Sequence, residues 1–457
     1  MEEADSDSVF ILDSECKMKV LSHPFEYIKF KNVFIPGFAK QLKEDVLQLD
    51  WSLTCSDLFS FLQTRNFINI KKKTPTIQLF VEALLGNIGD MLSDHYNIEF
   101  NKKVTVSGSV YRKGDFLLCH DDASDDRAVA FILYLTEEPW LKTWGGTLDL
   151  FQTIDSQVTH GKKSIVPSFN SLICFKVDPN VTYHQVSEVT ANVDRVSVNG
   201  WFHSDMFKHE PKLYLEPKVS LCKNIKFYSI GGHSYLTEFI NHKFFYKDWI
   251  SKKQKEFVVS NMLAAGDFFR SCTMHVLIEE LENKTLWKMQ GPPYKRKYDV
   301  ASITTLPTTL RTLVHFMTSL EWFNYFEAIT SLNKADILSS SFEIQRWLAG
   351  YYTLLYYTND LDEEPIDIID VFVYINMNNV QSNSRASAIV YSIQSPNEFE
   401  DDAFELQLVH NHIYLIHRKS HSSWFIKYLK KHVKNKFYLF QMSYSLSGQS
   451  LLRLKNR

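Results

Sequence analysis

The chain has 457 residues, of which 45% are hydrophobic and 14% aromatic, and its 50 basic and 53 acidic residues give a net charge of −3. This length predicts two or three domains with substantial hydrophobic cores. The near-neutral balance excludes a field that would hold a polyanion over the whole surface, although a basic patch could still exist locally. Neither composition nor motif suggests a base-stacking surface, and we expect no direct nucleic-acid binding.

Features of membrane and secreted proteins are missing from the sequence. The stretch Met1–Ser8 is acidic and polar rather than a secretory signal, and no apolar run is long enough for a membrane span. The 6 cysteines lie far apart, without a CxxC pair or a disulfide-dense spacing. We therefore expect a reducing location, in the cytoplasm and nucleus, and no membrane partner.

Hydrophobic periodicity divides the first half of the chain into a helix and a strand-rich stretch. Apolar residues recur every three or four positions over Thr76–Tyr96, which predicts an amphipathic helix. From about residue 100 to 205 the period changes to two, and we expect an all-β unit packed on that helix. Its predicted strands are Val104–Val110, Ala128–Leu135, Ser171–Val177 and Arg195–Phe202.

The second half returns to helices and then to strands. Helical periodicity is present between about 236 and 284 and again over Thr308–Leu332, and strand character lasts from about 342 to 445. We place the domain boundary near 225–240 and divide the chain into residues 1–230 and 231–457. The fold class predicted from this order is mostly β with flanking helices.

A weak internal repeat relates the two halves. The matched stretches are Gly114–His120 with Gly350–Tyr357, Ile132–Leu135 with Phe372–Ile375, and Ser171–Phe175 with Ser387–Tyr391. Three matches in the same order indicate two copies of one β unit. Alignment of the Leu-Leu pairs places Tyr357 where the first copy has His120 and Asn359 where it has Asp122, so the second copy has lost these side chains.

His120, Asp122 and His184 form the candidate metal site. Alternation along a strand would put His120 and Asp122 on one side and Asp121 on the other. Two histidines and one carboxylate on one face of a metal leave three positions open, which is the set that ferrous oxygenases use. Alone, His120 and Asp122 would more often form a surface turn, and His184 a hydrogen-bonded strand histidine.

Arg195 separates this site from a second His-x-Asp sequence. Arg195 opens a strand downstream of His184, and an inward-facing guanidinium there needs an anion. The alternative is a surface ion pair of Arg195 with Asp194 or Glu188. His203-Ser204-Asp205 has no comparable His and Arg after it, so we interpret it as a decoy.

These motifs together resemble the 2-oxoglutarate- and iron(II)-dependent ribosomal prolyl 3-hydroxylases. The stretches that carry the resemblance are Leu117–Asp122, Phe131–Leu135, Gly145–Leu150, His184–Val189 and Gly200–His203, with Gly291-Pro292-Pro293 as a further match. The similarity is close over about 105–205 and looser toward the C-terminus.

The resemblance implies the following expectations. His120, Asp122 and His184 fall on the iron ligands, and Tyr134 and Arg195 on the contacts of the cosubstrate. Two double-stranded β-helix (jelly-roll) domains are implied: a catalytic one in 1–230 with N-terminal helices, and one without metal ligands in 231–457 with interdomain helices. Iron(II), 2-oxoglutarate and dioxygen would be required, with ascorbate supporting activity, and the substrate would be a proline of a small ribosomal subunit protein.

The residues leave other functions open. A 2-oxoglutarate oxygenase could oxidise a different protein side chain or a nucleic acid, because the ligand set alone does not select the substrate. A non-catalytic scaffold is the alternative from another class, and an intact triad followed by Arg195 argues against it for the first half. Tyr134 could also be a simple core residue, although a buried hydroxyl still needs a partner.

Overall fold

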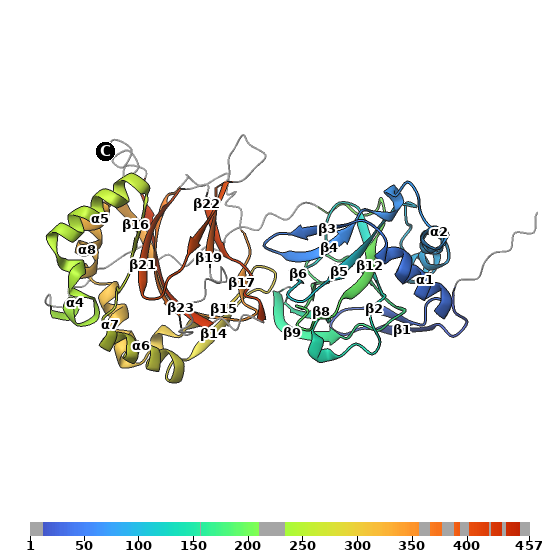
Figure 1. Ribbon diagram of the computed structural model, residues 1–457, viewed down its shortest axis with the longest axis horizontal. Coiled ribbons are helices and arrows are strands. Elements are labelled where there is room, and N and C mark those ends of the chain that lie inside the picture. The colour runs from blue at the N-terminus through green and yellow to red at the C-terminus, as the bar shows by residue number, and fades with distance from the viewer. Residues whose placement is uncertain are drawn as a thin grey trace, which may run out of the picture. The chain divides into compact units, whose positions relative to one another are not determined.

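The computed structural model of the chain describes residues 12–155, 157–209, 234–355, 366–376, 388–393, 402–419, 422–431 and 436–447. It forms two compact units (Figure 1), residues 1–212 with 291–295 and residues 213–290 with 296–457. The boundary predicted at residue 230 falls in 210–233, outside the described residues, and stays a prediction. Every described helix is too short or too polar to cross a membrane.

The first unit is built on one curled sheet. Its strands are β1 (Lys17–Leu21), β2 (Tyr27–Lys31), β3 (Trp51–Cys55), β4 (Phe59–Thr64), β5 (Val104–Tyr111), β6 (Phe116–His120), β7 (Arg127–Tyr134), β8 (Leu148–Ile154), β9 (Gln157–Ile165), β10 (Ser171–Lys176), β11 (His184–Val186) and β12 (Arg195–His203). They lie in the order β1-β2-β10-β7-β12-β5-β4-β6-β11-β8-β9, with β3 beside β4. Strand β4 pairs with β5 at one end and with β6 at the other, so the sheet folds over on itself there.

Helices cover the outer face of this sheet. They are α1 (Pro36–Leu47), α2 (Pro75–Ala83) and α3 (Gly89–Tyr96). Their apolar residues share one core with β2, β5, β7 and β12. The helix predicted over Thr76–Tyr96 is interrupted by a π-turn at Leu84–Ile88, where Gly86 leaves the helical region. A second cluster lies inside the curl and includes Tyr134, Leu150 and Phe175.

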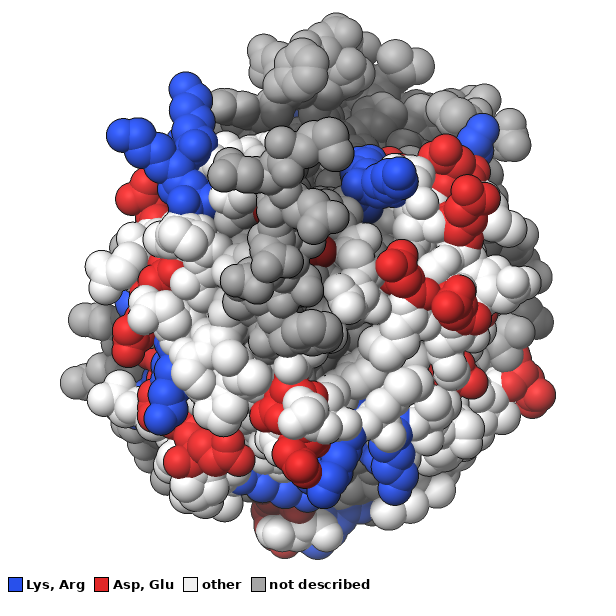
Figure 2. All heavy atoms as spheres, turned by 90° about the vertical axis from the view of Figure 1, so that its right-hand side faces the viewer, with Lys and Arg blue, Asp and Glu red and all other residues white. Residues whose placement is uncertain are grey.

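Surface charge is mixed on the side where α1 and α2 lie. Figure 2 shows basic and acidic side chains interspersed with uncharged ones on that face, in keeping with the net charge of −3. No single sign dominates the part of this face that the structure describes.

The second unit combines helices with further sheets. Its helices are α4 (Ser234–Phe239), α5 (Lys247–Ser260), α6 (Ser271–Asn283), α7 (Thr308–Met317) and α8 (Leu320–Thr330). Its strands are β13 (Met262–Ala265), β14 (Trp287–Gln290), β15 (Arg296–Ala301), β16 (Ile337–Leu348), β17 (Tyr352–Thr353), β18 (Ile368–Asn376), β19 (Ala388–Ile393), β20 (Asp402–Gln407), β21 (His412–Arg418), β22 (Ser422–Ile426) and β23 (Lys436–Leu446). The helix predicted over Thr308–Leu332 is two helices, because the Ser319 hydroxyl accepts the Trp322 N–H at 3.2 Å and starts α8.

The two units share a strand order. In the first, five strands lie in the order β2-β10-β7-β12-β5, and in the second five lie in the order β13-β21-β18-β23-β16. Ranked along the chain, both orders read first, fourth, third, fifth, second. Neighbouring strands are antiparallel in both groups.

An asparagine forms the same hydrogen bonds in each group. The Asn170 side chain accepts the Phe34 N–H at 3.1 Å and donates to the Phe34 carbonyl at 2.7 Å. The Asn411 side chain accepts the Phe269 N–H at 2.8 Å and donates to the Phe269 carbonyl at 2.9 Å. Both asparagines have positive φ, 55° and 56°. Such a shared local geometry supports the internal repeat.

Two of the three matched stretches occupy equivalent places. Gly114 and Gly350 have φ of 89° and 86°, and they donate their N–H to the carbonyls of Val189 and Leu429 at 2.8 and 2.6 Å. The second match joins β7 to β18, which are equivalent central strands. The third match is wrong: β10 lies beside β7, whereas β19 pairs with β20 and β22, and β21 takes the place of β10.

Candidate metal centre and anion pocket

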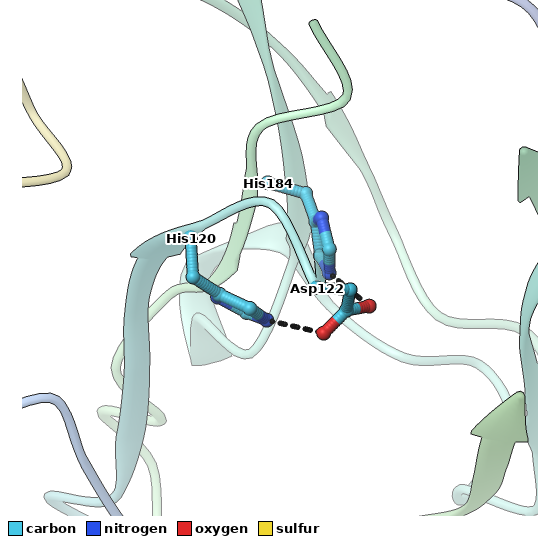
Figure 3. Close-up of side chains that lie close together, drawn as sticks. All are labelled: His120, Asp122 and His184. Atoms are coloured by element: carbon cyan, nitrogen blue, oxygen red, sulfur yellow. Dashed lines mark ion pairs between the residues drawn. The ribbon is translucent and has the colours of Figure 1, made fainter. Parts of the chain in front are cut away.

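Three predicted residues converge inside the curled sheet (Figure 3). His120 Nε2 lies 3.2 Å from Asp122 Oδ1, and His184 Nε2 lies 3.3 Å from Asp122 Oδ2. The imidazole centroids are 4.3 Å apart. In the described part of the chain this is the only group of three or more His, Cys, Asp or Glu side chains close enough to share a metal ion.

Backbone carbonyls orient both imidazoles. His120 Nδ1 lies 2.8 Å from the Leu118 carbonyl, and His184 Nδ1 lies 2.9 Å from the Thr182 carbonyl. A carbonyl only accepts, so each Nδ1 carries a proton, and in the neutral ring, the form that binds a metal, Nε2 keeps its lone pair. Metal-binding histidines are commonly held by this kind of contact. Both lone pairs therefore face the Asp122 carboxylate and the space beside it.

Asp122 reaches this place through a turn, which corrects the expected strand alternation. Strand β6 ends at His120, and Asp122 follows with a left-handed φ of 59°. Aspartate tolerates this conformation better than most residues. Asp121 points away as predicted, since its carboxylate accepts the N–H groups of Ala123 and Asn180 at 3.3 and 3.2 Å.

The electrostatics of the centre favour a bound cation. Burial alone would raise the pKa of the Asp122 carboxyl, but His184 and His120 beside it hold that pKa well below its usual range. Burial lowers the pKa of His120, yet the charge and hydrogen bond of Asp122 raise it overall. Donor atoms 3.2 and 3.3 Å apart suit a divalent ion, because two bonds of about 2.1 Å at a right angle separate their donors by about 3.0 Å.

Arg195 places an uncompensated cation in the same unit. Its side chain is buried at 1% exposure and belongs to β12. Nε donates to the Gly146 carbonyl at 2.7 Å and Nη1 to the Ser197 hydroxyl at 3.3 Å, but Nη2 is buried without a partner. No described carboxylate forms an ion pair with this guanidinium. A buried charge is costly unless it is paired, so this guanidinium requires an anionic partner.

Tyrosine rings enclose the guanidinium. The Arg195 carbon Cζ lies 5.1 Å from the ring centroid of Tyr111 and 5.1 Å from that of Tyr134. The Tyr134 hydroxyl is also buried without a partner, and burial raises its pKa, so it remains a donor. Gly146, with φ of 65°, makes room for the arginine stem, since a Cβ there would lie 2.9 Å from Arg195 Cδ.

Tyr111 and Ser109 were not selected from the sequence. The Ser109 hydroxyl is buried without a partner, and Ser109 lies opposite Ser197 in the β5–β12 ladder. The alternation of Val104–Val110, continued by one residue to the observed end of β5, puts Ser109 and Tyr111 on one face. From the sequence alone, small polar residues on one face of a strand are easily interpreted as exposed to solvent, because the part of the sheet that covers this face is not known.

The alternative roles considered for Arg195 and for His203 do not fit the places of these residues in the structure. Asp194 lies 3.8 Å from the exposed Arg112, and Arg195 is not on the surface. His203 Nδ1 lies 2.6 Å from Asp126, and its Nε2 lies 2.8 Å from the Thr105 hydroxyl, so both ring nitrogens are engaged. These contacts agree with the decoy interpretation of the second His-x-Asp.

In the second unit, rings occupy the place of the arginine. Arg195 lies two positions before the partner of Tyr134 in the β12–β7 ladder, and Phe437 lies two positions before the partner of Tyr374 in the β23–β18 ladder. Phe437 stacks on Trp347 at 5.9 Å and contacts Tyr374 at 5.2 Å. No cation stands at this place to bind a dicarboxylate. The predicted counterparts of His120 and Asp122, at 357 and 359, lie outside the described residues.

Each half of the chain matches the model of a known protein family. The 2OG-Fe(II) oxygenase superfamily matches residues 106–203, which contain the triad and Arg195. The family described as oxoglutarate and iron-dependent oxygenase degradation C-term matches residues 232–450.

Solved structures similar to the chain include a Pseudomonas putida prolyl-4-hydroxylase, with 17% identity and a TM-score of 0.34 over 39% of this chain and 92% of that one. A Trichoplax adhaerens prolyl hydroxylase, solved with a peptide of hypoxia inducible factor, has 16% identity and a TM-score of 0.33 over 39% and 84%.

Curated relatives cover more of the sequence. Prolyl 3-hydroxylase OGFOD1 of Mus musculus is 32% identical over 66% of this chain, and the alignment spans 56% of the mouse protein, little more than half its length. Prolyl 3-hydroxylase sudestada1 of Drosophila melanogaster is 26% identical over 92% of this chain and 82% of its own. Prolyl 3-hydroxylase OGFOD1 of Xenopus laevis is 30% identical over 75% of this chain and 70% of its own length. The chain therefore belongs to the prolyl 3-hydroxylase family within the 2OG-Fe(II) oxygenase superfamily.

Proposed function

We propose that this protein is an iron(II)- and 2-oxoglutarate-dependent hydroxylase of a prolyl residue, at carbon 3, in a small ribosomal subunit protein. One observation carries the oxygenase chemistry: a two-histidine, one-carboxylate centre and a buried arginine without an anion lie in the same curled sheet. The prolyl substrate is supported by the names of the relatives. The ribosomal protein is supported by the motif resemblance alone.

The side chains have separable roles in this proposal. His120, Asp122 and His184 would hold the iron, with the Nε2 atoms fixed by the backbone contacts of each Nδ1. Arg195 and Tyr134 would bind the distal carboxylate of 2-oxoglutarate through the two polar atoms that have no partner. Bound iron supplies dioxygen activation, in which 2-oxoglutarate becomes succinate and carbon dioxide and one oxygen atom enters the substrate C–H bond.

We also propose that both units are double-stranded β-helix domains, with limits 1–230 and 231–457, and that the second binds no metal. The shared strand order and the paired asparagine contacts support the duplication. The loss of the cosubstrate pocket in the second unit is supported by two rings: Phe437 stands where the first unit has Arg195, and Trp347 where it has Tyr111. A location in the cytoplasm and nucleus would bring the enzyme to newly made ribosomal proteins.

The test uses purified small-subunit ribosomal proteins incubated with the enzyme, iron(II), ascorbate and 2-oxoglutarate. The expected result is one added oxygen atom in one protein, assigned to a proline by fragment masses, with matching succinate formation. Asp122→Ala should abolish both signals. The exposed Arg112, which is 62% accessible, offers a matched control, because Arg112→Ala should preserve both.

Two results would count against the proposal in different ways. Succinate formation without any oxygen added to ribosomal proteins would exclude the substrate and keep the oxygenase. If no prolyl protein or peptide supports succinate formation above the Asp122→Ala background, the oxygenase assignment fails.

A further inference from the structure

Four lysines face one another across the edge of the first unit's sheet. Strands β1 and β2 pair antiparallel, with Lys17 opposite Lys31 and Lys19 opposite Lys29. Side chains directly opposite each other have Cβ atoms about 5 Å apart, and like charges in this position are destabilising. The sequence thus places two like-charged pairs in succession on one face of a hairpin.

A fifth lysine joins them from a distant strand. The Nζ atom of Lys163, in β9, lies 5.4 Å from the ring centroid of Tyr27. Tyr27 shares its face of β2 with Lys29 and Lys31, because side chains two positions apart point the same way. Figure 1 shows β1, β2 and β9 along the lower side of the first unit. Burial, then the charges of Lys31 and Lys163, lower the pKa of Lys29.

We name these five residues the lysine surface: Lys17, Lys19, Lys29, Lys31 and Lys163. No ammonium group of these five lysines forms a hydrogen bond or ion pair with a described residue, whereas the ammonium groups of other lysines in the same unit are paired. Lys162, next to Lys163, contacts Asp149, and Lys43 lies 2.6 Å from Glu137. The lysine surface is therefore a local excess of positive charge.

Protection of a sheet edge explains only part of this arrangement. Lysines on an edge strand discourage pairing with other chains, which accounts for Lys17 and Lys19 on β1. Strand β2 is not an edge, since β1 and β10 pair with it on either side. Lys29 and Lys31 on β2, and Lys163 on β9, need another reason.

We propose that the lysine surface binds the phosphate backbone of a nucleic-acid duplex. Ammonium groups act as point charges that suit phosphates, whereas the fork of arginine suits bidentate recognition of a carboxylate or a base edge. No Phe, Tyr or Trp is exposed among the described residues of the first unit. Single strands are bound through stacking on such rings, so a duplex contacted through its phosphates is the ligand that fits.

This inference goes beyond the proposed hydroxylase activity and does not depend on it. It revises the expectation drawn from net charge, because charges more than about 8 Å apart are largely screened at physiological salt. Carboxylates elsewhere on the chain therefore do not cancel five neighbouring ammonium groups. Phosphates of RNA and DNA share this chemistry, and the test distinguishes the two.

The test measures binding of the full chain to fluorescent RNA and DNA duplexes of one sequence by anisotropy at several salt concentrations. The variant Lys17→Gln, Lys19→Gln, Lys31→Gln, Lys163→Gln removes four charges. Each lost phosphate contact reduces the slope of log affinity against log salt by about 0.9, so the slope should fall by about 3.6. The wild type should lose about a hundredfold more affinity than the variant between about 50 and 200 mM salt.

The matched control replaces four exposed lysines elsewhere by glutamine, at Lys40, Lys72, Lys252 and Lys255, and should keep the wild-type slope. Melting temperature and succinate formation report folding, and arginine at the same four positions of the lysine surface should preserve binding. Equal slopes for the glutamine variant and its control would overturn the proposal. Tighter binding to polyglutamate or to phosphatidylserine vesicles than to either duplex would also overturn it. A preference between the two duplexes identifies the nucleic acid.

Discussion

Replacement of Arg195 by alanine tests the anion pocket directly. The guanidinium is 1% exposed, Nη2 has no partner, and the Tyr134 hydroxyl beside it is also unpartnered. A carboxylate bound there would become half of a buried charge pair, and breaking such a pair costs about 3–5 kcal/mol. At about 1.4 kcal/mol per tenfold, the 2-oxoglutarate requirement should rise by a factor between about one hundred and a few thousand.

The assay is 2-oxoglutarate titration of succinate formation, with ferrous iron binding measured in parallel. Iron binding should change little, because the described contacts of Arg195 go to Gly146, Ser197 and tyrosine rings, not to the triad. Arg195→Lys should restore part of the affinity, since an ammonium keeps the charge and loses the fork. Arg112→Ala is the control for loss of an arginine. A wild-type titration for Arg195→Ala, in a folded protein, would refute the pocket.

Further predictions concern the metal ligands, Tyr134, the stability of the protein in acid and the number of metal ions that the chain binds. His120→Ala should abolish turnover. His203→Ala should keep turnover and lower the free energy of unfolding by about 1–3 kcal/mol, because buried hydrogen bonds are lost. If turnover and denaturation curves show the reverse pattern, His203 rather than His120 is the metal ligand. Tyr134→Phe should raise the 2-oxoglutarate requirement only about two- to tenfold, because one hydrogen bond of about 0.5–1.5 kcal/mol is lost. Although burial opposes it, hydrogen bonds from His203 and Lys103 lower the pKa of Asp126 to about 2. Its stabilising effect is therefore complete above the unfolded pKa of about 4 and is lost as pH falls toward 2. Asp126→Asn should flatten the dependence of unfolding free energy on pH in that window, and an unchanged dependence would contradict the assignment. Metal analysis of the full chain should give one ferrous ion per molecule, and two would contradict a metal-free second unit.

Much of the first unit could be predicted because its strands carry a clear period. The triad and Arg195 were found from residue type and order, and the structure brings them into one unit. The route to Asp122 was mispredicted, since a left-handed residue after a strand leaves no mark in a two-residue period. Tyr111 was missed because its value comes from the ring-to-guanidinium contact with Arg195, which is separated from it along the chain.

The second unit was harder to predict for related reasons. The end of α7 depends on one capping hydroxyl, at Ser319, inside an otherwise continuous apolar pattern. The Ser387–Tyr391 match failed because similar apolar runs suit many buried strands, and only pairing partners tell them apart. Gly350 takes the place of Gly114, with one more residue between it and the Leu-Leu pair, because a positive φ restricts the residue type far more than burial does.

The asparagine contacts also set an order of events during synthesis. Asn170 holds the backbone of Phe34, which lies 136 positions earlier in the chain, and Asn411 holds the backbone of Phe269, which lies 142 positions earlier. Ribosomes add about 5–20 residues per second, so the first contact must wait for about 7–27 seconds after Phe34 is made. Strand β2 also lacks its partner β10 until then. Throughout this interval the edge of β2 that later pairs with β10 is open, and an open strand edge is exposed to chaperones or to aggregation.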